Sequence, residues 1–427
     1  MSLKRELGLI AVIVTVVGYV IGASIFVLPG QLAGAVGPAV VLSYGLAAVI
    51  AVFACIAAAQ LGSVFPNTGA GYVAIVRLLS PMGGFVTIWL MLAVYVLAIA
   101  LIASGFADYF LRLFPMVNRD VAAYGVVIFF GLINLGGAQN LVRLQALLVI
   151  IFMVALAVVS FGGVMAVEKS NLIPFMPTGL RPVMQAVVPA FFSYGGFMVV
   201  MELAGEIKRP ARTIPLGLAI SFVVVLVTYI ALSLSLVGSI NWQELATLNA
   251  PVSHLAEIFF GPWGGVFVAI AAVGAAATSV NALVLVASRD IIALADGGIF
   301  SARLSNATGS VLVVLVFSIM ALMLGQTVME YAVWVSGVTL LYQVIIGIAL
   351  LYILSRAPQE YAAAQFKLGR VGLIICGMGM IAVSTLFLYF VFAESQGRTI
   401  AAFGYLAVGI IYYLFRQKTY LNRETMI

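Results

Sequence analysis

Twelve long apolar runs, separated by short polar breaks, constrain this 427-residue chain more than any other feature. The runs fall at 8–33, 38–63, 84–111, 121–137, 143–166, 184–203, 214–239, 263–287, 310–326, 331–354, 372–393 and 399–415. A helix needs about 20 apolar residues to cross a bilayer. Because lipid offers the backbone no hydrogen bonds, runs of this length must satisfy their own backbone as helices. The sequence therefore predicts an all-α integral membrane protein with about twelve transmembrane helices.

The charge content agrees with a lipid environment. Only 8% of the residues are charged, whereas soluble domains carry about 25%. Both cysteines, Cys55 and Cys376, lie inside apolar runs, and His254 is the one histidine, so neither a disulfide framework nor a metal site is predicted. We expect membrane lipid as a partner and no cofactor. The net charge of +6 is interpreted as loop charge, not as a nucleic-acid-binding surface.

The lysines and arginines predict how the helices are oriented. With the N-terminus in the cytoplasm, 15 of the 20 cations fall in cytoplasmic segments, as the positive-inside rule requires. The five on the outer side are Arg112, Arg119, Lys169, Arg181 and Arg398. The first run is too long for the apolar part of a secretory signal, so we interpret it as a transmembrane helix. We expect a multi-pass protein of a cytoplasmic (inner) membrane with both termini cytoplasmic.

Glycine clusters predict interruptions in the first and sixth helices. Gly18, Gly22 and Gly30 are spaced along helix 1, and Gly195-Gly196 lies within helix 6. Glycine disfavours helix and lets a ligand approach the backbone. The alternative interpretation is that these glycines only permit close packing of helices in the membrane.

The positions of the two clusters favour a binding site. Helices 1 and 6 start on opposite sides of the membrane, so an inverted repeat of five helices brings their interruptions to the same depth. We expect the first repeat in 1–170, the second in 171–355, and two more helices with a cytoplasmic tail in 356–427. Interrupted helices offer free N–H groups to a carboxylate and free carbonyls to an ammonium, which suits an α-amino acid.

Five segments share residue patterns with one group of transporters. The segments are Ile21-Gly22-Ala23-Ser24-Ile25-Phe26, Pro66 with Gly69-Ala70-Gly71-Tyr72, Phe192-Ser193-Tyr194-Gly195-Gly196-Phe197, Glu206-Ile207-Lys208-Arg209-Pro210 with Arg212 and Ile214-Pro215, and Ser288-Arg289-Asp290 with Ala295-Asp296-Gly297. They are similar, in this order, to I-G-S-G-I-F, P-x-x-G-G-x-Y, F-x-Y-G-G-W, E-x-K-N-P-x-R-x-I-P and S-R-x-x-x-A-x-x-D-G. The chain thus resembles the amino acid–polyamine–organocation superfamily over roughly residues 5–300.

That resemblance implies an amino acid permease with the LeuT-type fold, a 5+5 inverted repeat with discontinuous helices 1 and 6. Backbone N–H groups of Ala23, Ser24 and Ile25 are then expected to hold the substrate carboxylate. Carbonyls of Val20, Phe192 and Gly195 are expected to take the amine, and the Phe192 ring to close over the substrate. The full expected substrate-binding set is Val20, Ile21, Gly22, Ala23, Ser24, Ile25, Phe192, Ser193, Tyr194, Gly195 and Gly196.

Two departures from the family pattern bear on mechanism. Ser24 stands where glycine is usual, so its hydroxyl either contacts ligand or caps the second half of helix 1. Several branches carry a lysine in helix 5 that replaces a sodium ion. That position falls near Phe152 here, and no lysine lies between Arg143 and Val167, which argues against coupling through a lysine.

The expected coupling ion is H⁺ or Na⁺. Ionisable groups at membrane depth are costly and hence functional candidates. Glu202 is the proton-carrier candidate, with a structural ion pair as its alternative, and Glu206 is expected to pair with Lys208, Arg77 or Arg289 near the inner gate. Thr278 and Ser279 could offer oxygens to a sodium ion beside helix 1, but such hydroxyls usually bond their own backbone.

The expected pocket walls predict a neutral amino acid as substrate. They are apolar: Tyr19, Ile21, Phe26, Phe192, Tyr194 and Phe197. A polyamine or cationic amino acid antiporter is the closer alternative, and it needs an acid at the site, for which Glu202 is the nearest candidate. A non-transporting receptor or structural membrane protein stays open as the alternative from another class. Neither an enzyme nor a channel is predicted, because the sequence shows no catalytic set at membrane depth and no repeated filter or ring of charge.

Overall fold

The fold is a bundle of helices. The computed structural model describes the backbone of residues 7–66, 70–135, 141–202, 204–393 and 395–424. Within these ranges the chain is helical apart from loops and one isolated β-bridge between Leu7 and Ile207. In the described part of the chain, seven helical stretches are long and apolar enough to cross a membrane, and three shorter apolar helices accompany them. The chain is thus an all-helical membrane protein. Within the described residues each of the twelve predicted runs overlaps at least one helix, but twelve crossings stay a prediction.

The helices of the first half are α1 (Leu9–Ile21), α2 (Ser24–Val36), η1 (Gly37–Ala39), α3 (Val40–Val64), α4 (Ala70–Leu78), α5 (Pro81–Leu113), α6 (Arg119–Leu135), α7 (Leu141–Met165) and η2 (Lys169–Leu172). The second half contains α8 (Leu180–Phe192), η3 (Gly195–Met198), α9 (Val199–Glu202), η4 (Ala204–Glu206), α10 (Pro210–Ser239), α11 (Trp242–Leu245), α12 (Pro251–Asp296), η5 (Ala302–Leu304), α13 (Ala307–Met323) and α14 (Val328–Arg356). The chain continues through α15 (Pro358–Ala363), α16 (Arg370–Ala393) and α17 (Gln396–Glu424).

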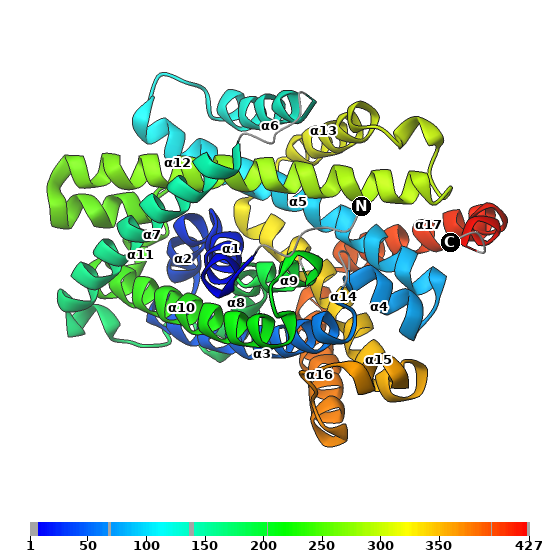
Figure 1. Cartoon of the computed structure of the whole chain (residues 1–427). Coiled ribbons are helices and arrows are strands. Elements are labelled where there is room, and N and C mark those ends of the chain that lie inside the picture. The colour runs from blue at the N-terminus through cyan, green and yellow to red at the C-terminus, as the bar shows by residue number, and fades with distance from the viewer. Residues whose placement is uncertain (1–6, 67–69, 136–140, 203, 394, 425–427) are drawn as a thin grey trace.

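The two interrupted helices occupy the middle of the bundle. Figure 1 shows α1 and α2 nearly end-on, with α10 and α3 along one side and α5 and α12 along the other. The packing partners of the two halves correspond: α3 packs on α8 as α10 packs on α1, α6 packs on α12 as α13 packs on α5, and α7 packs on α12 as α14 packs on α5. This correspondence is the one expected of two related halves.

Small residues on α3 explain how closely the central helices approach. Ala47, Ala51, Ala54 and Ala58 are all buried and recur at intervals of three or four residues, which places them on one face. Neighbouring helices α8 and α10 pack against α3. In lipid, helices associate through such small-residue faces because water provides no hydrophobic driving force there.

The segment before α1 is joined to the segment after α9. The Leu7 N–H donates to the Glu206 carbonyl at 3.0 Å, and the Lys208 N–H donates to the Leu7 carbonyl at 2.8 Å. These two backbone bonds form the β-bridge between Leu7 and Ile207. The ends of both interrupted helices are therefore fastened to each other.

Candidate functional site

The predicted interruption of helix 1 is present and is centred on Gly22. The first half, α1, ends at Ile21, and α2 begins at Ser24. Gly22 has φ 37° and ψ −139°, a backbone conformation that residues with a side chain rarely adopt. The chain can leave one helix and enter the next within two residues because this position is a glycine.

The break leaves hydrogen-bond donors without a backbone partner at the start of α2, in the buried residues Ala23, Ser24 and Ile25. No side chain caps this end of the helix. Among the residues that the structure describes, the N–H groups of Ala23, Ser24 and Ile25 make no hydrogen bond to a backbone carbonyl. Free N–H groups at a helix N-terminus carry partial positive charge and bind anions. The three N–H groups predicted to hold a carboxylate lie at this end of α2, and their binding role stays a prediction.

The predicted interruption of helix 6 is also present and touches that of helix 1. Helix α8 ends at Phe192, a turn at Ser193-Tyr194 follows, and the chain continues as the short helix η3. A Cβ built on Gly196 would lie 2.9 Å from the Tyr19 carbonyl carbon and 2.9 Å from the Val20 nitrogen. Only a glycine at this position lets the two broken segments make backbone contact.

Tyr229 of α10 lies between the two breaks. Its hydroxyl oxygen is 2.9 Å from Ser24 Oγ, 3.0 Å from the Ser193 carbonyl and 3.4 Å from the Val20 carbonyl. The Ser24 hydroxyl also donates to the Ile21 carbonyl at 3.0 Å. Ser24 therefore spans the break and does not cap α2. Sequence reasoning missed Tyr229, and the available signal was a phenol in the middle of the apolar run 214–239.

Two more buried tyrosines complete an aromatic cluster around this point. The Tyr44 ring stacks on Tyr229 with centroids 5.1 Å apart, and the Tyr194 ring lies 5.2 Å from Tyr229. The Tyr194 hydroxyl donates to the Tyr44 carbonyl at 3.2 Å. The hydroxyls of Tyr44 and Ser193 are buried without a well-directed hydrogen bond among the described residues. The cluster thus places two hydroxyls that lack a well-directed hydrogen bond beside the breaks.

Counting protons shows what kind of ligand the breaks would accept. Three carbonyls, those of Val20, Ile21 and Ser193, are approached by only two hydroxyl protons, from Ser24 and Tyr229. At least one carbonyl is therefore left without a donor from these two hydroxyls. A primary ammonium carries three N–H donors and would supply the missing bond. The arrangement therefore offers free donors on α2 and free acceptors nearby.

The expected pocket walls are packed on one side and accessible on the other. Ile21, Phe26, Tyr194 and Phe197 are buried, whereas Tyr19 and Phe192 are half-buried. Phe192 packs against apolar residues of α5 and α14. Gly195 is exposed, and no atom lies within 4 Å of where its Cβ would stand.

The sodium candidates bond within their own helix. Thr278 and Ser279 of α12 both donate to the Ala275 carbonyl, at 2.9 and 2.8 Å. Ser279 nonetheless lies beside helix 1, since a Cβ on Gly22 would be 3.0 Å from its Oγ. The alternative given for such hydroxyls, bonding to the helix backbone, is what the structure contains.

The position expected to carry a lysine in related branches is filled by an aromatic ring. Phe152 of α7 is buried and meets Phe26 of α2 edge-on, with centroids 6.4 Å apart. An aromatic ring, and not a lysine, therefore lies against the second half of helix 1 at this position.

The structure gives different information on the two acidic candidates, Glu202 and Glu206. The side chain of Glu202 lies outside the described part of the chain. Arg77 pairs with Glu360 of α15 at 3.3 Å, and Glu206 makes no ion pair among the described side chains, so the expected pairing of Glu206 is not found. The Glu206 backbone carbonyl instead accepts the bond from Leu7. Its place at the inner gate stays a prediction.

Comparison with known proteins covers nearly the whole chain. The model of the amino acid permease family matches residues 7–415. The branched-chain amino acid permease BcaP of Bacillus subtilis is 27% identical, with 98% of this chain and 94% of the relative aligned. The branched-chain amino acid permease BcaP of Lactococcus lactis is 30% identical over 55% of this chain and 56% of the relative. Cationic amino acid transporter 4 of Homo sapiens is 28% identical over 70% of this chain and 51% of the relative.

Proposed function

Because the chain belongs to the amino acid permease family, and so to the amino acid–polyamine–organocation superfamily, we propose that it carries neutral amino acids across a membrane by alternating access. Amino acid transport itself follows from the family, as does the conclusion that the chain is not an enzyme. The choice of neutral substrates, the site and the mechanism are the proposal.

The observation that supports the proposal is the pairing of the two breaks. Helix α2 offers uncapped N–H groups at Ala23, Ser24 and Ile25. The carbonyls at Val20 and Ser193 lie around a single hydroxyl, that of Tyr229. A zwitterion would satisfy both sets at once, with its carboxylate on the donors and its ammonium on the acceptors. We assign the binding role to the segments Val20–Ile25 and Phe192–Gly196, with Phe192 as the ring that closes over the substrate.

We infer that the side chain of the substrate is neutral from the residues that surround the two breaks. No described acidic side chain forms a hydrogen bond or ion pair with the residues of either break, and the neighbouring side chains are apolar, phenolic or, at Ser279, a hydroxyl. A cationic side chain buried there would have no counter-charge, which is costly. The two bacterial relatives are named for branched-chain amino acids, which agrees with this assignment. The human relative is named for cationic amino acids and supports the alternative, for which Glu202 would have to supply the charge.

The proposed architecture is the LeuT-type fold of twelve transmembrane helices. The interrupted helices α1–α2 and α8–α9 each begin a set of five runs, and the packing partners of the two sets correspond. We therefore propose inverted repeats in 1–170 and 171–355, with 356–427 outside them. Both termini are placed in the cytoplasm by the distribution of lysine and arginine. Coupling to H⁺ or Na⁺ is part of the proposal, with Glu202, Thr278 and Ser279 as the groups to test.

Ligand-dependent thermal stability tests the substrate class first. Purified protein is heated with leucine, valine, isoleucine, alanine, arginine, lysine or putrescine, because a ligand that binds only the folded state raises its stability. We expect branched and small neutral amino acids to raise the melting temperature, and counterflow in liposomes to show exchange of the same compounds. Stabilisation by arginine, lysine or putrescine alone would transfer the proposal to the cationic alternative. No stabilisation and no counterflow by any amino acid would refute the site.

A further inference from the structure

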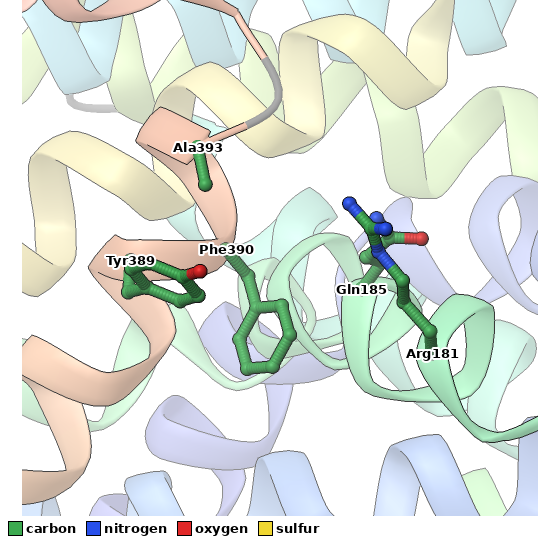
Figure 2. Close-up of a pocket in the computed structure, with 5 residues that line it drawn as sticks. All are labelled: Arg181, Gln185, Tyr389, Phe390 and Ala393. Atoms are coloured by element: carbon green, nitrogen blue, oxygen red, sulfur yellow. The ribbon is translucent and has the colours of Figure 1, made fainter.

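A separate pocket lies between the first turns of α8 and the end of α16. It has a volume of about 330 Å³ and is lined by Arg181, Gln185, Tyr389, Phe390 and Ala393. Figure 2 shows Arg181 and Gln185 on α8 on one side and the rings of Tyr389 and Phe390 on α16 on the other. The volume is at the lower end of the roughly 300–1,000 Å³ of small-molecule sites. The pocket is thus large enough for an amino acid, and it is open at the surface, since Arg181, Tyr389 and Ala393 are exposed.

The helical spacing connects this pocket to the candidate site. Arg181, Gln185, Val188 and Phe192 follow at intervals of four, three and four residues, so they share one face of α8. Arg181 stands about 16 Å along the helix axis from Phe192. Val188, between them, is only 2% exposed. The pocket and the helix 6 break therefore lie along the same face of α8, and the buried Val188 separates them.

The chemistry of the lining fits a carboxylate with an apolar side chain. Of the five outer cations, Arg112 pairs with Glu257 and Arg119 pairs with Asp108, but Arg181 has no acidic partner among the described residues. A guanidinium binds a carboxylate with two parallel bonds, and the Gln185 amide adds a donor. The rings of Tyr389 and Phe390 offer an apolar wall, and the face of an aromatic ring also attracts an ammonium.

We propose that this pocket is an outer binding site, where Arg181 holds the carboxylate of an amino acid before it passes Val188 and Phe192 to the helix breaks. The inference rests on the proposed function. It gives the chain two binding sites on one face of α8. The outer site recognises the carboxylate by charge, whereas the central site recognises it by backbone N–H groups.

Binding stoichiometry tests the inference directly. Equilibrium dialysis of purified protein with radiolabelled leucine should give two molecules bound per chain in the wild type and one in Arg181→Gln. Arg181→Lys keeps the charge but loses the planar fork, so its outer site should be weakened without being lost. Lys169→Gln is the matched control, since it removes an equal charge from an exposed residue of η2 that does not line the pocket.

Transport from one side provides the second readout. In liposomes with the protein in one orientation, Arg181→Gln should raise KM for uptake from the outer side on the order of tenfold and leave the maximal rate unchanged. Transport from the inner side should keep its wild-type KM. An equal KM change on both sides would indicate a general structural defect and overturn the inference.

The remaining outcomes separate the possible failures. One leucine per chain in both the wild type and Arg181→Gln would refute the outer site and leave the proposed function intact. If Arg181→Gln instead loses co-purified phospholipid, with leucine binding unchanged, the pocket holds a headgroup phosphate and the inference is overturned. No leucine binding by the wild type would refute both the central site and the outer one.

Discussion

The contact between Gly196 and helix 1 gives a prediction that can be worked out in detail. Replacing Gly196 with alanine places a Cβ 2.9 Å from the Tyr19 carbonyl carbon and the Val20 nitrogen, and 3.0 Å from the Tyr19 oxygen. Ordinary contact begins at 3.4 Å, so the two segments must separate by about 0.5 Å. Backbone atoms cannot rotate away as a side chain can. Overpacking of this kind typically costs about 1–3 kcal/mol.

The neighbouring glycine supplies the control. A Cβ on Gly195 would meet no atom within 4 Å, and its φ lies in the ordinary range. Gly195→Ala should therefore fold as stably as the wild type. Its methyl group would project into the accessible space at the break, so we expect weaker substrate binding without loss of stability. The same substitution is thus predicted to lower stability at Gly196 and substrate affinity at Gly195.

The assay measures melting and uptake on the same preparations. Gly196→Ala should melt several degrees below the wild type and transport poorly, because the donors on α2 and the acceptors near Tyr229 are displaced from each other. Gly195→Ala should melt at the wild-type temperature with a raised KM. Equal stability of Gly196→Ala and the wild type would show that helices 1 and 6 do not make this contact.

Three further predictions concern the same site. Gly22→Val should abolish transport while membrane insertion persists, since a positive φ costs a β-branched residue about 1–3 kcal/mol; wild-type uptake by this variant in vesicles would exclude the helix 1 site. Tyr229→Phe should lower the melting temperature of the ligand-free protein by leaving buried carbonyls unsatisfied, at about 1–3 kcal/mol, and saturating substrate should recover part of that loss; an unchanged melting curve would contradict the role of the hydroxyl. Joint replacement of Thr278 and Ser279 by alanine should leave the ratio of uptake in sodium to uptake in choline at its wild-type value, because both hydroxyls bond the helix backbone; loss of a sodium stimulation seen in the wild type would restore the sodium site.

The helices and their interruptions could be predicted because their causes are local. The length of an apolar run can be read directly from the sequence. A glycine inside such a run, such as Gly22, indicates a possible break, and the positive φ of Gly22 in the structure agrees with it. Glycine pairs such as Gly195-Gly196 carry the same kind of signal. The two breaks were therefore located from short stretches of sequence, and the family model supports the superfamily assignment made from motifs.

The tyrosine cluster could not be predicted because its cause is the packing of distant helices. Tyr44, Tyr194 and Tyr229 come from three separate runs, and nothing in each run indicates that their rings meet. The same holds for Arg77, whose partner Glu360 is 283 residues away, whereas sequence reasoning considered the nearer Glu206. Contacts of this kind depend on which helix faces which.

The bridge between Leu7 and Ile207 has a mechanical consequence. Its two bonds involve backbone atoms only, so substitutions that keep a backbone N–H at these positions leave the connection intact. While the bridge holds, we expect the first half of helix 1, α1, to move only together with the end of helix 6. The first half of helix 1 and the end of helix 6 are then expected to move as one unit. A proline at position 7 would remove the N–H that Leu7 donates and leave only the bond from the Lys208 N–H to the carbonyl of residue 7, so we expect it to weaken the connection between helices 1 and 6.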